Sequence, residues 1–299
     1  MKIRFLLIFL ILNNFFIYNL AKSEIFEIES SQIDILEKGN LVKAYGGVKV
    51  LSEDGTEITG KEVRYNKEKL ILETIGNVVV IDKKNNVIFK SDKIIYNKKK
   101  EIISSYKIDN QAIITDKKNN ITIQSDKITY NIKKEIISSD KIDNQAIITD
   151  KKNNITIQSD KITYNIKKEI ISSLGDTYAN LQNKYEIKST ELVHNKNNME
   201  IYSSKKSKIE DRLGNIFELE SFKFNINEKL LKAKNITLFD TKNNKYNLKN
   251  SLVNLNTNEI VGSDISIDFD NSLFGNKKNE PRLKGKSLIS NENESIIYK

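Results

Sequence analysis

The chain has 299 residues, of which 49 are basic and 40 acidic, and it contains one proline, no tryptophan and no cysteine. The lack of cysteine excludes disulfides and thiolate metal sites, so stability has to come from apolar burial and backbone hydrogen bonds. Basic and acidic residues are interspersed along the whole chain. This pattern favours a solvated surface over a nucleic-acid interface, and we expect no nucleic-acid partner.

The first 23 residues have the layout of a secretory signal peptide. Two basic residues precede the apolar run 5–12, and the small residues Ala21 and Ser23 occupy the minus-three and minus-one positions of a cleavage site after Ser23. Cleavage removes three basic and no acidic residues, which lowers the net charge from +9 to +6. An uncleaved anchor is disfavoured because two asparagines interrupt the ~20 apolar residues that a spanning helix needs.

An internal repeat organises the rest of the chain. Residues 107–139 and 141–173 are identical, so the repeat period is 34 residues (141 − 107). A diverged copy occupies 78–105, and looser copies continue on both sides at spacings of 30 or 31 residues. We interpret the chain as about seven repeats that each contact chiefly their neighbours, an organisation that tolerates an extra copy.

The most regular feature of the repeat is a pair of apolar residues separated by one polar residue, then four further residues, then a second such pair. In the first identical copy the pairs are Ile121 with Ile123 and Ile128 with Tyr130. Alternation of Ile, Val, Thr, Tyr and Phe with period two is typical of β-strands with one buried face. Helix-pair solenoids have a similar period but need apolar residues at helical spacing, so we reject them.

The four residues between two pairs shift the alternation by one position. Both pairs face the same side only if the chain turns a corner or forms a bulge there, so each repeat is predicted to wrap around a common interior. The segments DKKNN (116–120) and GNKKN (275–279) are predicted to be turns, in which asparagine accepts left-handed backbone conformations.

Two units, GGVKVLSEDGTEITGKEVRYN (46–66) and GNVVVIDKKNNVIFKSDKIIYN (76–97), resemble the repeated motif of the OstA-like superfamily. This superfamily includes the lipopolysaccharide-transport proteins LptA, LptC and the periplasmic part of LptD. The resemblance extends from about Phe26 to about Phe269. It implies an all-β fold, an elongated antiparallel β-jellyroll built as a V-shaped stack of strands, with lipopolysaccharide acyl chains lying in a groove that is open at both ends.

The tail LFGNKKNEPRLKGKSLISNENESIIYK (273–299) looks like the segment that follows the jellyroll in LptD and leads toward its outer-membrane barrel. The expected organisation is therefore a signal peptide at 1–23, a jellyroll repeat domain at 24–272 and an LptD-like junction segment at 273–299. LptD proteins usually carry cysteines for interdomain disulfides, and this chain has none.

The resemblance also implies partners and a location. The expected partners are lipopolysaccharide, through its lipid A acyl chains, other OstA-like jellyroll proteins, and an outer-membrane barrel. The mature protein is expected in the periplasm, associated with the outer membrane. Its N-terminal edge, residues 25–36, is expected to accept the terminal strand of a partner, because an unpaired sheet edge invites strand addition.

The predicted groove lining consists of the apolar members of the repeat, among which phenylalanines offer area and tyrosines add a polar tip for the rim. For any single one of these residues, a role as core that fills the stack is favoured over contact with lipid, because a stack of strands needs a core in either case, and both interpretations stay open. The candidate lining residues are Ile58, Val63, Tyr65, Val87, Phe89, Ile94, Tyr96, Ile121, Ile123, Ile128, Tyr130, Ile155, Ile157, Ile162, Tyr164, Ile187, Leu192, Phe217, Phe222, Phe224, Leu248, Val253 and Leu255.

No catalytic residue, metal site or cofactor is predicted. The single histidine, His194, stands at the tyrosine position of the repeat, and one histidine without cysteine forms neither an ordinary zinc site nor a nucleophilic triad. Asp116 and Asp150 recur at equivalent turn positions, which suits turn chemistry better than a glycosidase pair, and neighbouring lysines oppose calcium. Two rival functions stay open: a structural or adhesive surface repeat protein without a lipid ligand, and a carbohydrate-active β-solenoid enzyme.

Overall fold

The computed structural model describes residues 25–270, 282–291 and 294–298. It confirms the predicted all-β fold, because within these ranges every regular element except one short 3-10 helix is a strand, and the 23 strands form one antiparallel sheet. The same ranges contain no helix that is long and apolar enough to cross a membrane. The predicted signal peptide and the predicted turn 275–279 lie outside the described residues.

The strands follow one another with short connections. They are β1 (Phe26–Leu36), β2 (Leu41–Ser52), β3 (Thr56–Asn66), β4 (Ile71–Asp82), β5 (Val87–Asn97), β6 (Ile102–Tyr106), β7 (Ala112–Asp116), β8 (Ile121–Ser125), β9 (Lys127–Asn131), β10 (Ile136–Asp140), β11 (Ala146–Asp150), β12 (Ile155–Asn165), β13 (Ile170–Leu181), β14 (Tyr185–Asn195), β15 (Glu200–Ser203), β16 (Ser207–Asp211), β17 (Ile216–Leu219), β18 (Ser221–Asn225), β19 (Leu230–Phe239), β20 (Lys245–Asn254), β21 (Glu259–Asp268), β22 (Arg282–Ser290) and β23 (Ser295–Tyr298). The helix η1 (Glu37–Gly39) joins β1 to β2.

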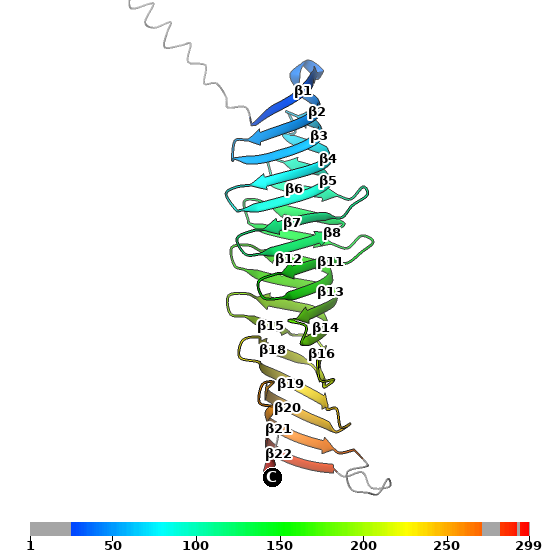
Figure 1. The fold of residues 1–299 in the computed structure, drawn as a ribbon, viewed down its shortest axis with the longest axis vertical. Helices are drawn as coiled ribbons and strands as arrows, with labels where there is room; N and C mark the ends of the chain where they lie inside the picture. The colour runs from blue at the N-terminus through cyan, green and yellow to red at the C-terminus, as the bar shows by residue number, and fades with distance from the viewer. Residues whose placement is uncertain (1–24, 271–281, 292–293, 299) are drawn as a thin grey trace, which may run out of the picture.

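The strands are stacked in chain order along an elongated molecule, with β1 at one end and β22 at the other (Figure 1). From β1 to β5 each strand pairs with the next one in the chain. Further along, some layers consist of two short strands: β6 and β7 both pair with β5, and β10 and β11 both pair with β12. A layer of the stack is therefore one long strand or two half-length strands.

Each long strand bends near its middle, so the stack has two walls. In β2, residues 41–45 belong to one wall, which we call wall A, and residues 48–52 to the other, wall B; the register with β3 shifts between them. Wall A also contains β6, β9, β10, β15, β18 and β23, and wall B contains β7, β8, β11, β16 and β17. This shift brings the apolar pairs of both walls to one interior, as the sequence predicted.

The corner between the walls is built in two ways. Gly175 has a φ of 87°, and a Cβ there would lie 2.6 Å from the Asp160 carboxylate, so glycine is required. In the identical repeats a longer corner segment replaces glycine, and the backbone amides of Asp143 and Asn144 donate to Asp126 at 3.0 and 2.8 Å. Burial alone would raise the pKa of the Asp126 carboxyl, but these donors and the Gln111 side chain hold that pKa well below its usual range.

The tight turns confirm the role predicted for asparagine. Asn86, Asn120 and Asn154 each end a four-residue turn in wall B with φ between 53° and 59°. At the other end of the chain, β21 pairs with β22 and β22 with β23, so the described part of 273–299 extends the sheet past residue 272.

The exact repeat leads to a test of the stacked organisation. Deletion of residues 140–173 joins Ser139 to Leu174 and restores the sequence of β13, IISSLGDTYANL. Because one repeat supplies two layers that are ~4.8 Å apart, we expect a folded protein that is about 10 Å shorter. Small-angle scattering measures the length, and circular dichroism measures the cooperativity of melting.

A half-repeat deletion provides the matched control. Removal of residues 140–156 takes out about one layer, which reverses the direction of every later strand relative to its neighbour. We expect this variant to misfold. If the full-repeat deletion misfolds equally, contacts between neighbouring repeats do not account for the stability of the stack.

Candidate functional site

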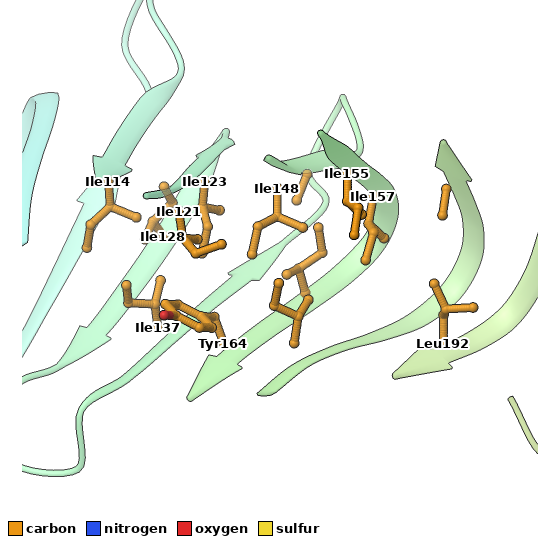
Figure 2. Packing of buried hydrophobic residues seen from close by; sticks show 14 of the residues in the cluster. Ile114, Ile121, Ile123, Ile128, Ile137, Ile148, Ile155, Ile157, Tyr164 and Leu192 are labelled. Atoms are coloured by element: carbon orange, nitrogen blue, oxygen red, sulfur yellow. The ribbon is translucent and has the colours of Figure 1, made fainter. Parts of the chain in front are cut away.

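The two walls enclose one apolar interior, and the candidate lining residues lie in it. All of them except Leu255 are buried members of a single core cluster, and Leu255 is partly buried against that cluster. Figure 2 shows isoleucines from several layers, such as Ile123, Ile148 and Ile157, converging with Tyr164 and Leu192 in this interior. The interior is continuous from β1 to β22, because the cluster includes Phe26 and Leu288.

Half of the interior was missed by sequence reasoning. The return strands of each repeat contribute Ile103, Ile114, Ile137, Ile148 and Ile171, which are also buried. Their strands show the same period-two alternation, in EIISS and AIITD, and this was the available signal. Small residues such as Ala112 and Ser105 stand at other inward positions there, which weakens the apolar pattern.

The side of the stack opposite the corner, where the hairpin turns of both walls lie, forms a mouth that is closed by repeated hydrogen bonds. The Tyr130 hydroxyl of wall A donates to Asp82 in a wall B turn at 2.7 Å, and Tyr164 donates to Asp116 at 2.9 Å. We call these bonds latches. A third latch joins the Tyr96 hydroxyl to Asp54 at 3.0 Å. All three latch tyrosines are fully buried, so their hydroxyl groups reach the rim without contacting solvent.

Each latch aspartate also holds its own turn. In the Asp82 turn, the Asn85 backbone amide and side-chain amide donate to the carboxylate at 3.0 and 2.7 Å, and the Asn85 side chain reaches the Tyr130 hydroxyl at 3.0 Å. Burial and the neighbouring carboxylate raise the pKa of Tyr130 far above its usual value, so the phenol stays protonated and donates. One carboxylate thus fixes a turn and fastens the two walls together.

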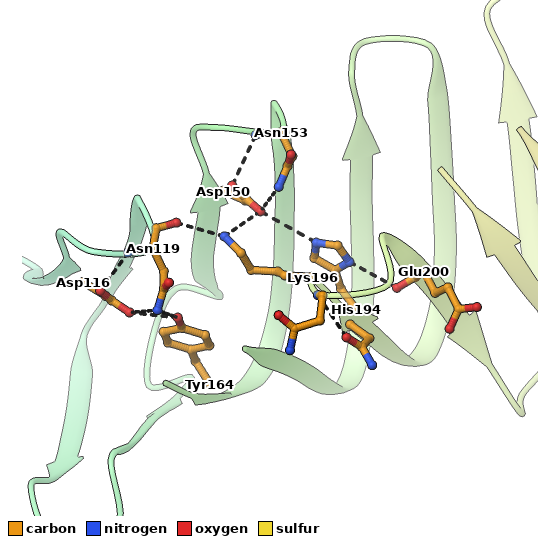
Figure 3. Close-up of polar contacts among 10 residues, drawn as sticks. Asp116, Asn119, Asp150, Asn153, Tyr164, His194, Lys196 and Glu200 are labelled. Carbon is orange, nitrogen blue, oxygen red and sulfur yellow. Dashed lines mark hydrogen bonds and ion pairs between the residues drawn. The ribbon is translucent and has the colours of Figure 1, made fainter. Parts of the chain in front are cut away.

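His194 takes the place of the latch tyrosine in the fourth latch, and the histidine alone does not reach its aspartate. Its Nε2 lies 3.8 Å from Asp150, while its Nδ1 lies 3.2 Å from the Glu200 carbonyl. Lys196 completes this latch, since its Nζ lies 3.0 Å from Asp150 and donates to the Asn119 carbonyl at 2.9 Å (Figure 3). Burial alone would raise the pKa of Asp150, but its hydrogen-bond partners hold that pKa well below its usual range.

Among the described residues, the latches to an aspartate end after His194. One further polar bond crosses the mouth, because the Lys229 Nζ of wall A donates to the Gln182 side chain of wall B at 3.0 Å. The strand pairing continues the tyrosine row through Ile201, Phe224, Leu231 and Val253, none of which carries a hydroxyl. In the last repeat the period predicts Val253 and Leu255 as the second apolar pair, with Leu255 at the tyrosine position. This frame is wrong by two residues, because Val253 occupies the tyrosine position and Leu255 follows β20 in the turn. The interruption of the apolar alternation by Asn250 and Ser251 caused this error.

Beyond the last latch the mouth opens into a cavity of about 580 Å³. Phe217 and Leu238 line it from wall B, and Val253 and Ile260 line it from wall A, so the cavity reaches between the walls. Asp211 and Asp240 stand at its rim but bind within wall B: Asp211 accepts from Asn215 at 2.7 Å, and Asp240 accepts from Tyr246 at 3.2 Å. Neither fastens the walls by a bond within the described residues.

In the described part of the chain, no strand covers either end of the interior. Ile33 and Ile35 pair with the buried residues Ala44 and Val42 and therefore face the interior, yet they are 44% and 67% exposed because β1 is the last strand at its end. At the other end Leu283 pairs with buried Ile267 and is 47% exposed. Each end presents apolar side chains and an unpaired strand edge.

The described ranges contain no group of three or more His, Asp or Glu side chains arranged to hold a metal ion. A comparison with protein families and one with curated proteins found no match to this chain. A comparison with solved structures found LptH, the LptA homologous periplasmic component of the lipopolysaccharide transport device of Pseudomonas aeruginosa. The identity is 13%, the match covers 50% of this chain and 81% of LptH, and the TM-score is 0.22.

The latches predict a measurable contribution to stability. We expect Tyr130→Phe and Tyr164→Phe each to lower the free energy of unfolding by about 1–2 kcal/mol, because a buried carboxylate loses one donor. Tyr106→Phe, on an exposed tyrosine of the same wall, is the control and should change it by less than about 0.5 kcal/mol. Urea unfolding measures the difference; equal effects for the three variants would show that the latches do not hold the walls together.

Proposed function

We propose that the protein is a non-enzymatic component of lipopolysaccharide transport, related to the OstA-like superfamily, which shields acyl chains in its interior. One observation carries this proposal: a single apolar interior runs the length of the stack, is left uncovered at both ends by the described residues, and opens sideways at the cavity between Phe217 and Val253. Transfer of each methylene from water to such an interior is favourable by about 0.8 kcal/mol.

The latched and unlatched parts of the mouth have different roles in this proposal. Between Tyr96 and Tyr164 the interior is filled by side chains that are completely buried, so an acyl chain enters there only if the walls separate. At the cavity the walls are already apart and no latch has to break. We therefore propose that an acyl chain first enters at the unlatched mouth.

The completely packed interior between Tyr96 and Tyr164 also fits a second function, that of a structural or adhesive repeat protein. Side chains that pack completely against one another are what a structural or adhesive repeat protein needs, and such a protein has no lipid ligand. The two functions differ at the cavity, which has no purpose in a purely structural stack.

Lipopolysaccharide binding tests the proposal. We expect purified mature protein to melt at a higher temperature with lipopolysaccharide, and Val253→Trp to abolish most of this shift by filling the cavity. Ile113→Trp, at an outward position of β7, is the control and should keep the shift. Thermal denaturation and native mass spectrometry provide the measurements. If lipopolysaccharide does not change the melting temperature and no lipid co-purifies with the protein, the structural function is favoured.

We further propose that the protein joins another jellyroll end to end through β1, in the periplasm against the outer membrane. The support is the free edge of β1 together with the exposed interior residues Ile33 and Ile35 beside it. A photoreactive amino acid at position 33 should crosslink to a jellyroll protein in intact cells, whereas the same group at Tyr106, in the middle of the stack, should not. Equal labelling at the two positions contradicts end-to-end pairing.

A further inference from the structure

The outer face of wall A carries one continuous row of side chains, whose chemistry changes along the stack. At the N-terminal end the paired strands place Lys43, Arg64 and Glu73 in this row, and in the middle they place hydroxyl residues such as Thr129 and Thr163. Polar residues predominate in this part of the row, as expected of a solvated face, and its apolar members, such as Ile95 and Val193, are few.

The last six members of the row are different. Pairing of β18 through β23 sets them side by side in the order Lys223, Lys232, Leu252, Val261, Ile289, Ile296. The last three are 42% to 48% exposed, although nothing in the fold requires apolar residues on this face. Because neighbouring strands lie ~4.8 Å apart, the four apolar residues span about 14 Å.

The face is hollowed where the lysines meet the apolar residues. A cavity of about 960 Å³ is lined by Lys223, Lys232, Leu252 and Val261, together with Tyr202. Behind it, three small residues follow one another in one inward row, Ala233, Ser251 and Gly262. In earlier layers of that row a small residue always alternates with a large one, as Ser139 does with Ile128 and Ile162.

The charges of the hollow are unbalanced. Lys223 is paired with Glu200 at 2.7 Å, but Lys232 and Lys234 have no carboxylate partner among the described residues. A positive end and an apolar end in one line match an amphiphile with an anionic head and a single extended chain. A concave site fits one such molecule, whereas a flat bilayer needs protruding apolar side chains.

We propose that the outer face of wall A between β18 and β23 binds one anionic single-chain amphiphile, with its carboxylate or phosphate at Lys223 and Lys232 and its chain along Leu252, Val261 and Ile289. This site faces away from the interior and is independent of the cargo proposed there. Either site can therefore fail without the other.

The test uses mature protein and cis-parinaric acid, a fatty acid whose fluorescence rises in apolar surroundings. We expect the double variant K223E/K232E to weaken its binding at least about tenfold, since both head contacts become repulsive. The matched control is K43E/R64E, which reverses two charges in the same row at the other end and should leave the affinity unchanged. The methyl ester, which lacks the anionic head, should bind the unaltered protein more weakly than the acid does, and K223E/K232E should bind the ester about as well as the unaltered protein does, because the ester carries no charge to repel.

Location is checked separately with a diazirine-labelled palmitate and mass spectrometry. Crosslinks at Leu252, Val261 or Ile289 support the proposal, and V261S should reduce them while circular dichroism shows an unchanged fold. The proposal is overturned if the acid does not bind, if K223E/K232E and K43E/R64E bind it equally, or if the crosslinks fall only on interior residues such as Phe217 and Leu238. Binding to anionic vesicles without binding of the monomeric acid would also overturn it.

Discussion

The structure depends on one geometric constraint, a shift of the strand alternation by one residue at the corner of each layer. Without this shift, the apolar residues of wall A and wall B would face opposite sides of the sheet and no shared interior would form. Glycine makes the corner at Gly76 and Gly175, and a longer aspartate-capped segment makes it in the identical repeats. Two unrelated local solutions therefore satisfy the same requirement.

Closure of the mouth depends on a second feature, the polar bonds that join the two walls. Apolar contact alone brings the walls together, but the buried carboxylates at Asp82, Asp116 and Asp150 are tolerated only because each is saturated by donors from its own turn and from the opposite wall. Phe224 and Val253 lack the tyrosine hydroxyl, and in the Phe224 layer Lys229 donates across the mouth to Gln182 instead. The mouth then opens although the walls and the corner continue unchanged.

The strands, their inward faces and the corner were predictable because each rests on period-two alternation or on turn residues, which are local signals. The latches were not, since Tyr130 and Asp82 are 48 positions apart and two layers intervene, although both residue types recur with the repeat. The recurrence of Asp116 and Asp150 at turns was read correctly as turn chemistry, but their second role needs the opposite wall. Leu255 was placed wrongly where Asn250 and Ser251 broke the alternation.

Regular packing requires neighbouring layers to be alike, whereas a local binding site requires one layer to differ from its neighbours. The identical repeats lie where the interior is most completely filled, and there every layer satisfies the same contacts as the next, so a copied unit fits without adjustment. The unlatched mouth, the small residues behind the wall A hollow and the apolar outer row all lie after residue 200, where the repeat has lost the latch tyrosine. Divergence at one end of a regular stack is what a local binding role requires, because a site needs residues that its neighbouring layers do not share.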